Sequence, residues 1–132
     1  MADYASTALG LSHFAVGVSS LISPRFTSSV FLLSYDPTAS FITRLFGSRD
    51  LILGYSIVSS ATTDSSSAQK RRWAVGLANL INGFDVASAL VEWFKSDCTD
   101  QGALFGGVGA AALLALGIWS LRNENQYTKP RI

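Results

Sequence analysis

The stretch that decides the fold is residues 101–121, QGALFGGVGAAALLALGIWSL, which contains no ionisable side chain. Wound as an α-helix, this stretch is apolar on every face. Crossing a bilayer core takes about 20 helical residues, which is the length available here. A transmembrane β-barrel would instead need many segments of alternating hydrophobicity separated by turns. The stretch therefore predicts a membrane-spanning helix.

Three other segments extend this interpretation to the whole chain. Residues 4–24 carry no formal charge, and His13 is their only titratable side chain. Two apolar segments interrupted by polar groups follow, at about residues 37–63 and 73–94. We therefore predict an all-α fold, a four-helix transmembrane bundle that forms a single integral membrane domain over residues 1–132. The expected helices span roughly residues 5–23, 37–63, 72–95 and 102–121.

The composition agrees with a membrane protein and excludes several other classes. Charged residues make up 14% of the chain, against about 25% in ordinary soluble domains, and the mean hydropathy is +0.31. A formal net charge of +1 offers no basic face to a nucleic-acid partner. One cysteine and one histidine cannot build a disulfide framework or a multi-histidine metal centre, so we expect no metal and no cofactor.

Proline and polar residues predict where the helices begin and end. Pro24 is expected to end the first helix, and Asp36 followed by Pro37 resembles an N-cap with a first-turn proline. The polar run at residues 62–67 and the basic residues 70–72 are expected to form the next loop.

The basic residues predict the orientation in the membrane. With four crossings, the N-terminus, the loop at 64–72 and the C-terminal tail share one side, which carries Lys70, Arg71, Arg72, Arg122, Lys129 and Arg131. Cytoplasmic loops carry an excess of basic residues, so we expect a multi-pass protein of the endoplasmic reticulum with both termini in the cytosol. The first segment follows Asp3 and no basic residue, unlike a secretory signal peptide.

Polar side chains inside the predicted spans mark the candidate site, because each ionisable group there costs about 2.5–3.5 kcal/mol on insertion scales. In the third helix, one stripe carries Asn79, Asn82, Asp85 and, nearer its end, Glu92. In the second helix, Arg49 and Asp50 reach a depth comparable with that of Asn82 and Asp85. We therefore expect the two aspartates, Arg49 and the two asparagines to meet in the interior, with Arg49 reaching Asp85 or a neighbouring helix.

Small residues predict where helices pack closely. Asp50 shares one face of its helix with Thr43, Gly47 and Gly54, and the first helix has a similar face with Gly10, His13, Gly17 and Ser20. His13 is a candidate for orienting a substrate, although a structural role explains it more simply. Tyr55 and Arg72 are secondary candidates, and Arg72 is explained more simply as a determinant of topology.

The segments 46–54, FGSRDLILG, 72–76, RWAVG, and 82–85, NGFD, resemble a family of unknown function made of small four-helix membrane proteins that are common in fungi. Its pattern is Gly-x-Arg-Asp, a glycine four residues later, and an aspartate midway along the third helix. The resemblance covers residues 45–86, and Ser48 departs from the pattern. Some such proteins belong to fungal polyketide and terpenoid pathways, which implies a membrane-bound hydrolase or cyclase for epoxidised lipophilic intermediates. The residues implied are Arg49, Asp50 and Asp85, with Arg72 second.

Two carboxylates in a dry site suit the opening of an epoxide, which needs a base and an acid. In this hypothesis Asp50 is the base, Asn82 places the nucleophile, Asp85 is the protonated acid and Arg49 holds the pair in register, although the two acids can exchange roles. The alternative is a non-catalytic membrane module that binds a lipophile or partner helices, or associates with itself through its glycine-rich fourth helix. An enzyme needs a cavity at the acids, whereas a cluster that only ties helices together is fully packed. Ion transport would need acids at several depths, and only Glu92 extends the series.

Overall fold

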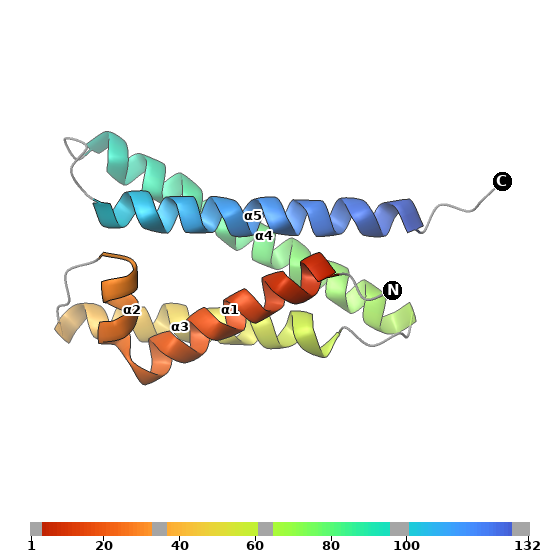
Figure 1. Ribbon diagram of the computed structural model, residues 1–132, viewed down its shortest axis with the longest axis horizontal. Coiled ribbons are helices and arrows are strands. Elements are labelled where there is room, and N and C mark those ends of the chain that lie inside the picture. Colours follow the sequence, from red (N-terminus) through yellow and green to blue (C-terminus); the bar gives the residue numbers. More distant parts are fainter. Residues whose placement is uncertain (1–3, 33–36, 61–64, 96–100, 128–132) are drawn as a thin grey trace.

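The computed structural model describes residues 4–32, 37–60, 65–95 and 101–127, and all regular structure in these ranges is helical (Figure 1). The helices are α1 (Tyr4–Ile22), α2 (Pro24–Val30), α3 (Pro37–Ser59), α4 (Ser65–Lys95) and α5 (Gln101–Tyr127). The prediction of an all-α fold is confirmed for this part of the chain. The prediction of four helices is not, because α2 was missed.

Pro24 ends one helix and begins another. Proline lacks a backbone N–H and is tolerated at the first position of a helix, where that group would have no partner within the helix. After α1 ends at Ile22, Pro24 therefore opens the seven-residue α2. This helix stops at Phe31, whose N–H donates to the carbonyl oxygen of Thr27 at 3.1 Å. The N-cap predicted at Asp36 lies outside the described residues, although α3 does begin at Pro37.

Two helices are longer than their apolar stretches. The residues from 65 to 72, expected as part of a loop, form the first two turns of α4, and α5 continues from 121 to Tyr127. Lysine, arginine and glutamine are good helix formers, so a helix can extend past the point where its residues stop being apolar. Hydrophobicity marks the part of a helix that lipid can surround, and it does not mark the end of the helix.

The helices form two packed pairs, α1 with α3 and α4 with α5. In Figure 1, α1 lies along α3 in the lower half, while α4 crosses beneath α5 and descends toward the first pair. The pairs meet where α1 contacts α5 and α3 contacts α4. The apolar core is at this junction, and its members are Leu9, Leu53, Ile57, Val75 and Ala78.

Within the part of the chain that the structure describes, three helical segments are long and apolar enough to cross a membrane, namely Tyr4–Ile22, Ser67–Lys95 and Leu104–Asn123. Helix α3 is not among them, because its sequence includes Arg44, Arg49 and Asp50. Many large apolar side chains face outward, among them Phe14, Phe41, Ile52, Trp73, Phe84 and Phe105. So many exposed large apolar side chains suit contact with lipid better than contact with water. These features indicate a membrane protein.

Candidate functional site

Five polar side chains from three helices form one cluster in the interior of the fold. His13 comes from α1, Arg49 and Asp50 from α3, and Asn82 and Asp85 from α4. The predicted meeting of the two acids, Arg49 and Asn82 is therefore present in the structure. His13 joins them, which its sequence context alone did not establish.

Arg49 connects the two carboxylates. Its Nε donates to Asp50 Oδ1 at 3.3 Å, and its Nη1 and Nη2 donate to the two carboxylate oxygens of Asp85 at 3.4 and 3.0 Å. A guanidinium group presents its donors as a planar fork, and a two-point contact with a carboxylate uses this geometry fully. The Arg49 guanidinium also lies 5.0 Å from the centre of the Phe46 ring, which adds a cation–π contact on the same helix. Arg49 therefore ties α3 to α4.

His13 extends the cluster to α1. Its Nε2 lies 3.3 Å from the side-chain nitrogen of Asn82, and its Nδ1 lies 3.4 Å from Asp50 Oδ1. An amide N–H that donates to Nε2 leaves the ring proton on Nδ1, where it faces the Asp50 carboxylate. The Nδ1 contact has the distance of an ion pair but not the alignment of a hydrogen bond. The five groups thus form a chain in the order Asn82, His13, Asp50, Arg49, Asp85.

This chain runs from the protein interior to its edge. His13 and Asn82 are 1% and 2% exposed, and Asp50 is also buried. The side chains of Arg49 and Asp85, by contrast, are 31% and 35% exposed. Only the Arg49–Asp85 end of the cluster can therefore meet a molecule from outside the helix bundle.

Close contact between α1 and α3 places His13 beside Asp50. A Cβ atom on Gly17 would collide with the backbone of Leu51, and one on Gly54 would lie 2.6 Å from the carbonyl oxygen of Gly10. A Cβ atom on Gly47 would similarly lie 2.6 Å from the Cβ of Ser20. The two small-residue faces predicted from the sequence are therefore close-packing faces, and the structure shows that they pack against each other. His13 and Asp50 lie between these glycines on the two facing surfaces.

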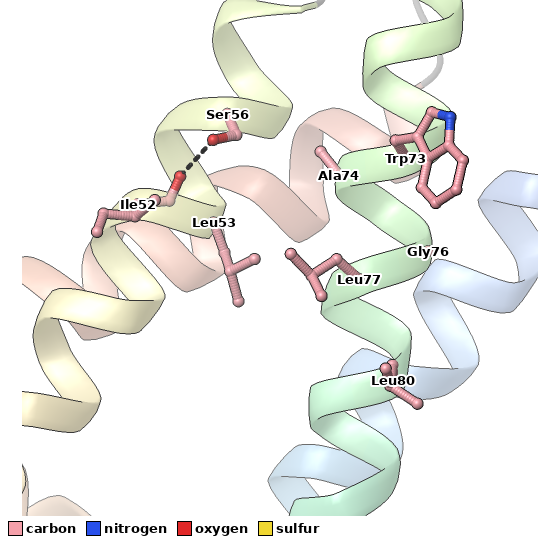
Figure 2. A pocket seen from close by; sticks show the side chains of 8 residues that line it. All are labelled: Ile52, Leu53, Ser56, Trp73, Ala74, Gly76, Leu77 and Leu80. Atoms are coloured by element: carbon pink, nitrogen blue, oxygen red, sulfur yellow. Dashed lines mark hydrogen bonds between the residues drawn. The ribbon is translucent and has the colours of Figure 1, made fainter.

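An apolar groove of about 420 Å³ lies between α3 and α4. Its lining residues are Ile52, Leu53, Ser56, Trp73, Ala74, Gly76, Leu77 and Leu80. Figure 2 shows Leu53 and Leu77 pointing toward each other from opposite walls. The Ser56 hydroxyl donates to the carbonyl oxygen of Ile52 at 2.7 Å, so this lining hydroxyl is used within its own helix. The groove thus offers an apolar surface with little hydrogen-bonding capacity.

The groove leads toward the exposed end of the cluster. Along α3, Arg49 is one turn from Leu53, and along α4, Asp85 is less than two turns from Leu80. The helices run in opposite directions, since Arg49 pairs with Asp85 while Ser56 and Trp73 line the other end. The groove itself was not predicted, because its walls are ordinary apolar residues that belong to two different helices.

The other predicted site residues lie away from the cluster. Asn79 faces α5, where its amide packs against Gly117, and its buried Oδ1 has no hydrogen-bond partner among the described residues. Tyr55 is exposed on α3, and Arg72 is exposed near the start of α4. Glu92 is 65% exposed near the end of α4, where its carboxylate lies 4.0 Å from the Lys95 amine. The predicted inward stripe on α4 therefore ends at Asp85 and does not include Glu92.

The α4–α5 pair uses part of the glycine-rich face predicted on the last helix. A Cβ atom on Gly107 would lie 2.8 Å from that of Ala89, and Gly117 accommodates Asn79. A Cβ atom on Gly106, by contrast, would have no neighbour within 4 Å among the residues that the structure describes. A hydrogen bond of 2.5 Å between the hydroxyls of Ser6 and Ser120 joins α1 to α5, a contact that the sequence interpretation missed. Serine at small-residue positions of apolar helices was the available signal.

Comparison with protein-family models, with curated proteins and with solved structures found no match for this chain. The family resemblance drawn from the Arg49–Asp50 motif therefore stays a prediction. The case for function consequently depends on the polar cluster, the groove beside it and the apolar helices that surround both.

Proposed function

We propose that this protein is a membrane-embedded enzyme that opens an epoxide in a lipophilic substrate held in the α3–α4 groove. The substrate class follows the resemblance to fungal membrane proteins of polyketide and terpenoid pathways. The groove offers an apolar surface for such a molecule. The Arg49–Asp85 pair at its end offers the polar groups that the reaction needs.

The observation that carries this proposal is the partial exposure of the Arg49–Asp85 pair beside an apolar groove. Ionisable groups in a membrane protein are expensive and usually face the bundle interior or a cavity. A pair that only tied α3 to α4 would need no access from outside the helices. Here about a third of each side chain is accessible, at 31% and 35%, next to a groove of about 420 Å³.

The exposure of the two carboxylates favours one of the two possible assignments of acid and base. The Asp85 side chain is 35% exposed whereas that of Asp50 is 11% exposed, so Asp85 is the better placed of the two to act as the base on a substrate. It would take a proton from water, whose oxygen attacks one epoxide carbon while the bond from that carbon to the ring oxygen breaks. The Arg49 guanidinium would stabilise the alkoxide that forms, and the proton returned from Asp85 would complete the diol. A hydroxyl of the substrate in place of water would give a cyclised product.

In this mechanism the buried end of the cluster positions Arg49. Asp50 accepts a hydrogen bond from Arg49 Nε, and His13 of α1, whose ring contacts Asn82 of α4, lies against the Asp50 carboxylate. Asp50 is therefore a positioning residue, which differs from the role of base assigned to it from the sequence.

Replacing Asp85 tests the proposal directly. Deleting the gene in the producing organism should cause an epoxide to accumulate, and wild-type protein should restore its conversion. Because general acid–base assistance contributes about 10²–10⁴-fold, Asp85→Asn should lower conversion at least about 100-fold at normal protein levels. Glu92→Gln is the matched control on the same helix and should restore full conversion. An unchanged metabolite profile after deletion, or normal conversion by Asp85→Asn, contradicts the proposal.

The proposal includes a location and a topology. Helices α1, α3, α4 and α5 would each cross the membrane of the endoplasmic reticulum, with both termini and Lys70, Arg71 and Arg72 in the cytosol. Helix α3 would cross although it is less apolar, because Arg49 and Asp50 are paired with groups of α1 and α4. Labelling of single cysteines, introduced into a Cys98→Ser background, from either side of the membrane tests this arrangement. A Lys70→Cys variant that is labelled only from the lumen would contradict it.

A second candidate is a non-catalytic module that binds a lipophile, with the cluster tying its helices together. The observation in its favour is that both carboxylates already accept hydrogen bonds from Arg49. Under this alternative Asp85→Asn lowers the stability of the protein, while no epoxide accumulates after gene deletion. The deletion experiment therefore separates the two candidates.

A further inference from the structure

We propose that the α3–α4 groove takes a single-chain amphiphile whose carboxylate head group lies near Lys70 and whose apolar chain extends toward Arg49 and Asp85. This inference narrows the substrate class and rests on the groove assigned in the proposed function. It does not rest on the reaction, because a carboxylate ligand can be bound without being converted.

Lys70 lies on the face of α4 that lines the groove. It precedes Trp73, Ala74 and Leu77 by three, four and seven residues, the spacing at which residues share one face of a helix. Lys70 is exposed, and it stands one turn beyond the groove's last lining residues. The Lys70 ammonium group is therefore the next side chain beyond the apolar lining, at the Trp73 end of the groove.

The surroundings of Lys70 are those of a membrane–water interface. Arg71 and Arg72 follow it in the chain, and their charges add to a positive potential that attracts anions. Trp73 lines the same end of the groove and is mostly exposed. Exposed tryptophan and basic residues are typical of the depth at which lipid head groups meet water. An anionic head group would thus be opposite in charge to Lys70 and would lie at the same depth in the membrane.

The rest of the groove suits a single apolar chain. Its walls include Ile52, Leu53, Leu77 and Leu80, and its volume of about 420 Å³ falls at the lower end of the range for small-molecule sites. Fifteen residues separate Lys70 from Asp85 along α4, which is about 22 Å of helix. A head group bound at Lys70 would leave the far part of an extended chain near the Arg49–Asp85 pair. The reacting carbons would therefore be remote from the carboxylate.

Binding of oleic acid and of oleyl alcohol to the full chain in phosphatidylcholine nanodiscs tests the inference, with empty nanodiscs as the background. Lys70→Gln should weaken binding of oleic acid about fivefold and leave the alcohol unchanged, because only the acid loses a charge partner. Lys95→Gln, at the other end of α4, is the matched control and should change neither. Leu77→Trp should fill the groove and weaken both ligands at least about tenfold. Val91→Trp, an equally exposed position beyond the groove, should weaken neither.

Several results would overturn the inference. If Lys70→Gln and Lys95→Gln change the affinity for oleic acid equally, the head group does not bind at Lys70. If Leu77→Trp leaves the affinity for both ligands unchanged, the groove is not the binding site. If a two-chain phosphatidic acid displaces bound oleic acid as effectively as unlabelled oleic acid does, the natural occupant is a membrane phospholipid instead. If only the proposed function is wrong, deletion of the gene causes no epoxide to accumulate, but the purified protein still binds oleic acid in a manner that depends on Lys70. Epoxide conversion without any dependence on Lys70 would overturn this inference alone.

Discussion

Replacing Gly54 by alanine should separate α1 from α3 and lower the stability of the protein. The added Cβ atom would lie 2.6 Å from the carbonyl oxygen of Gly10 and 2.7 Å from the Cα of Phe14. Both are backbone atoms of α1, so a rotamer change cannot relieve the overlap. The two helices must therefore move apart along their closest line of contact.

The size of the effect follows from this displacement. Non-bonded carbon atoms prefer separations of about 3.5–4.0 Å, so the helices would have to separate by about 1 Å, and a gap of that size forfeits about a quarter to a half of each local dispersion contact. Overpacking of this kind costs about 1–3 kcal/mol. Alanine's higher helix propensity offsets about 1 kcal/mol of this cost, so the expected net loss is at most about 2 kcal/mol in the free energy of unfolding. Asp50, one turn away on the same face, would also move from His13.

Gly83→Ala is the matched control, because no atom of the described residues lies within 4 Å of a Cβ atom at that position. The same substitution should there be neutral or stabilise by up to about 1 kcal/mol. Unfolding of the purified proteins in mixed detergent micelles, followed by circular dichroism, measures both variants against the wild type. The two substitutions should differ in sign. Gly54→Ala protein as stable as Gly83→Ala protein would refute the close packing of α1 on α3.

Two further predictions concern polar side chains. Arg49→Lys should lower the free energy of unfolding by about 1–2 kcal/mol, because a single ammonium group cannot reproduce the fork that contacts both Asp50 and Asp85. The same unfolding titration checks this, and unchanged stability of the Arg49→Lys variant would contradict it. Asn79→Leu should be neutral or stabilise by up to about 1 kcal/mol, because it removes a buried oxygen that has no partner among the described residues. Asn82→Leu is its matched comparison and should destabilise by about 0.6–1.7 kcal/mol through loss of the bond to His13. If the two leucine substitutions change the free energy of unfolding equally, then Asn82 gains no more from its partner than Asn79 does.

Much of the helical architecture could be predicted because it follows from local properties of the chain. The uncharged stretches at 4–24 and 101–121 are long enough to span lipid, and both belong to helices in the structure. Helix boundaries were less accurate where they do not coincide with a change in hydrophobicity. Residues 68–72, AQKRR, are good helix formers although most of them are polar, and α2 is too short to produce a recognisable apolar pattern.

The candidate site could be predicted in part. Ionisable residues in apolar helices are costly enough to stand out in a sequence, and helical periodicity restricts the directions in which they point. This reasoning identified Arg49, Asp50, Asn82 and Asp85, which form contacts in the structure. It did not distinguish Glu92, because the distance of a residue from the middle of the membrane depends on where the helix ends and how it is tilted.

By itself, the sequence determined that the chain forms apolar helices, that Gly17 and Gly54 lie on close-packing faces, and that a few ionisable side chains lie within those helices. These properties depend on residue type and on spacing along one helix. Only the tertiary structure decided that the faces of α1 and α3 meet, that His13 adjoins Asp50, and that α3 and α4 leave an apolar groove between them. The physical reason is that helix pairing depends on the packing of whole surfaces. Residues far apart in the sequence create those surfaces together, and no single stretch of the chain contains that information.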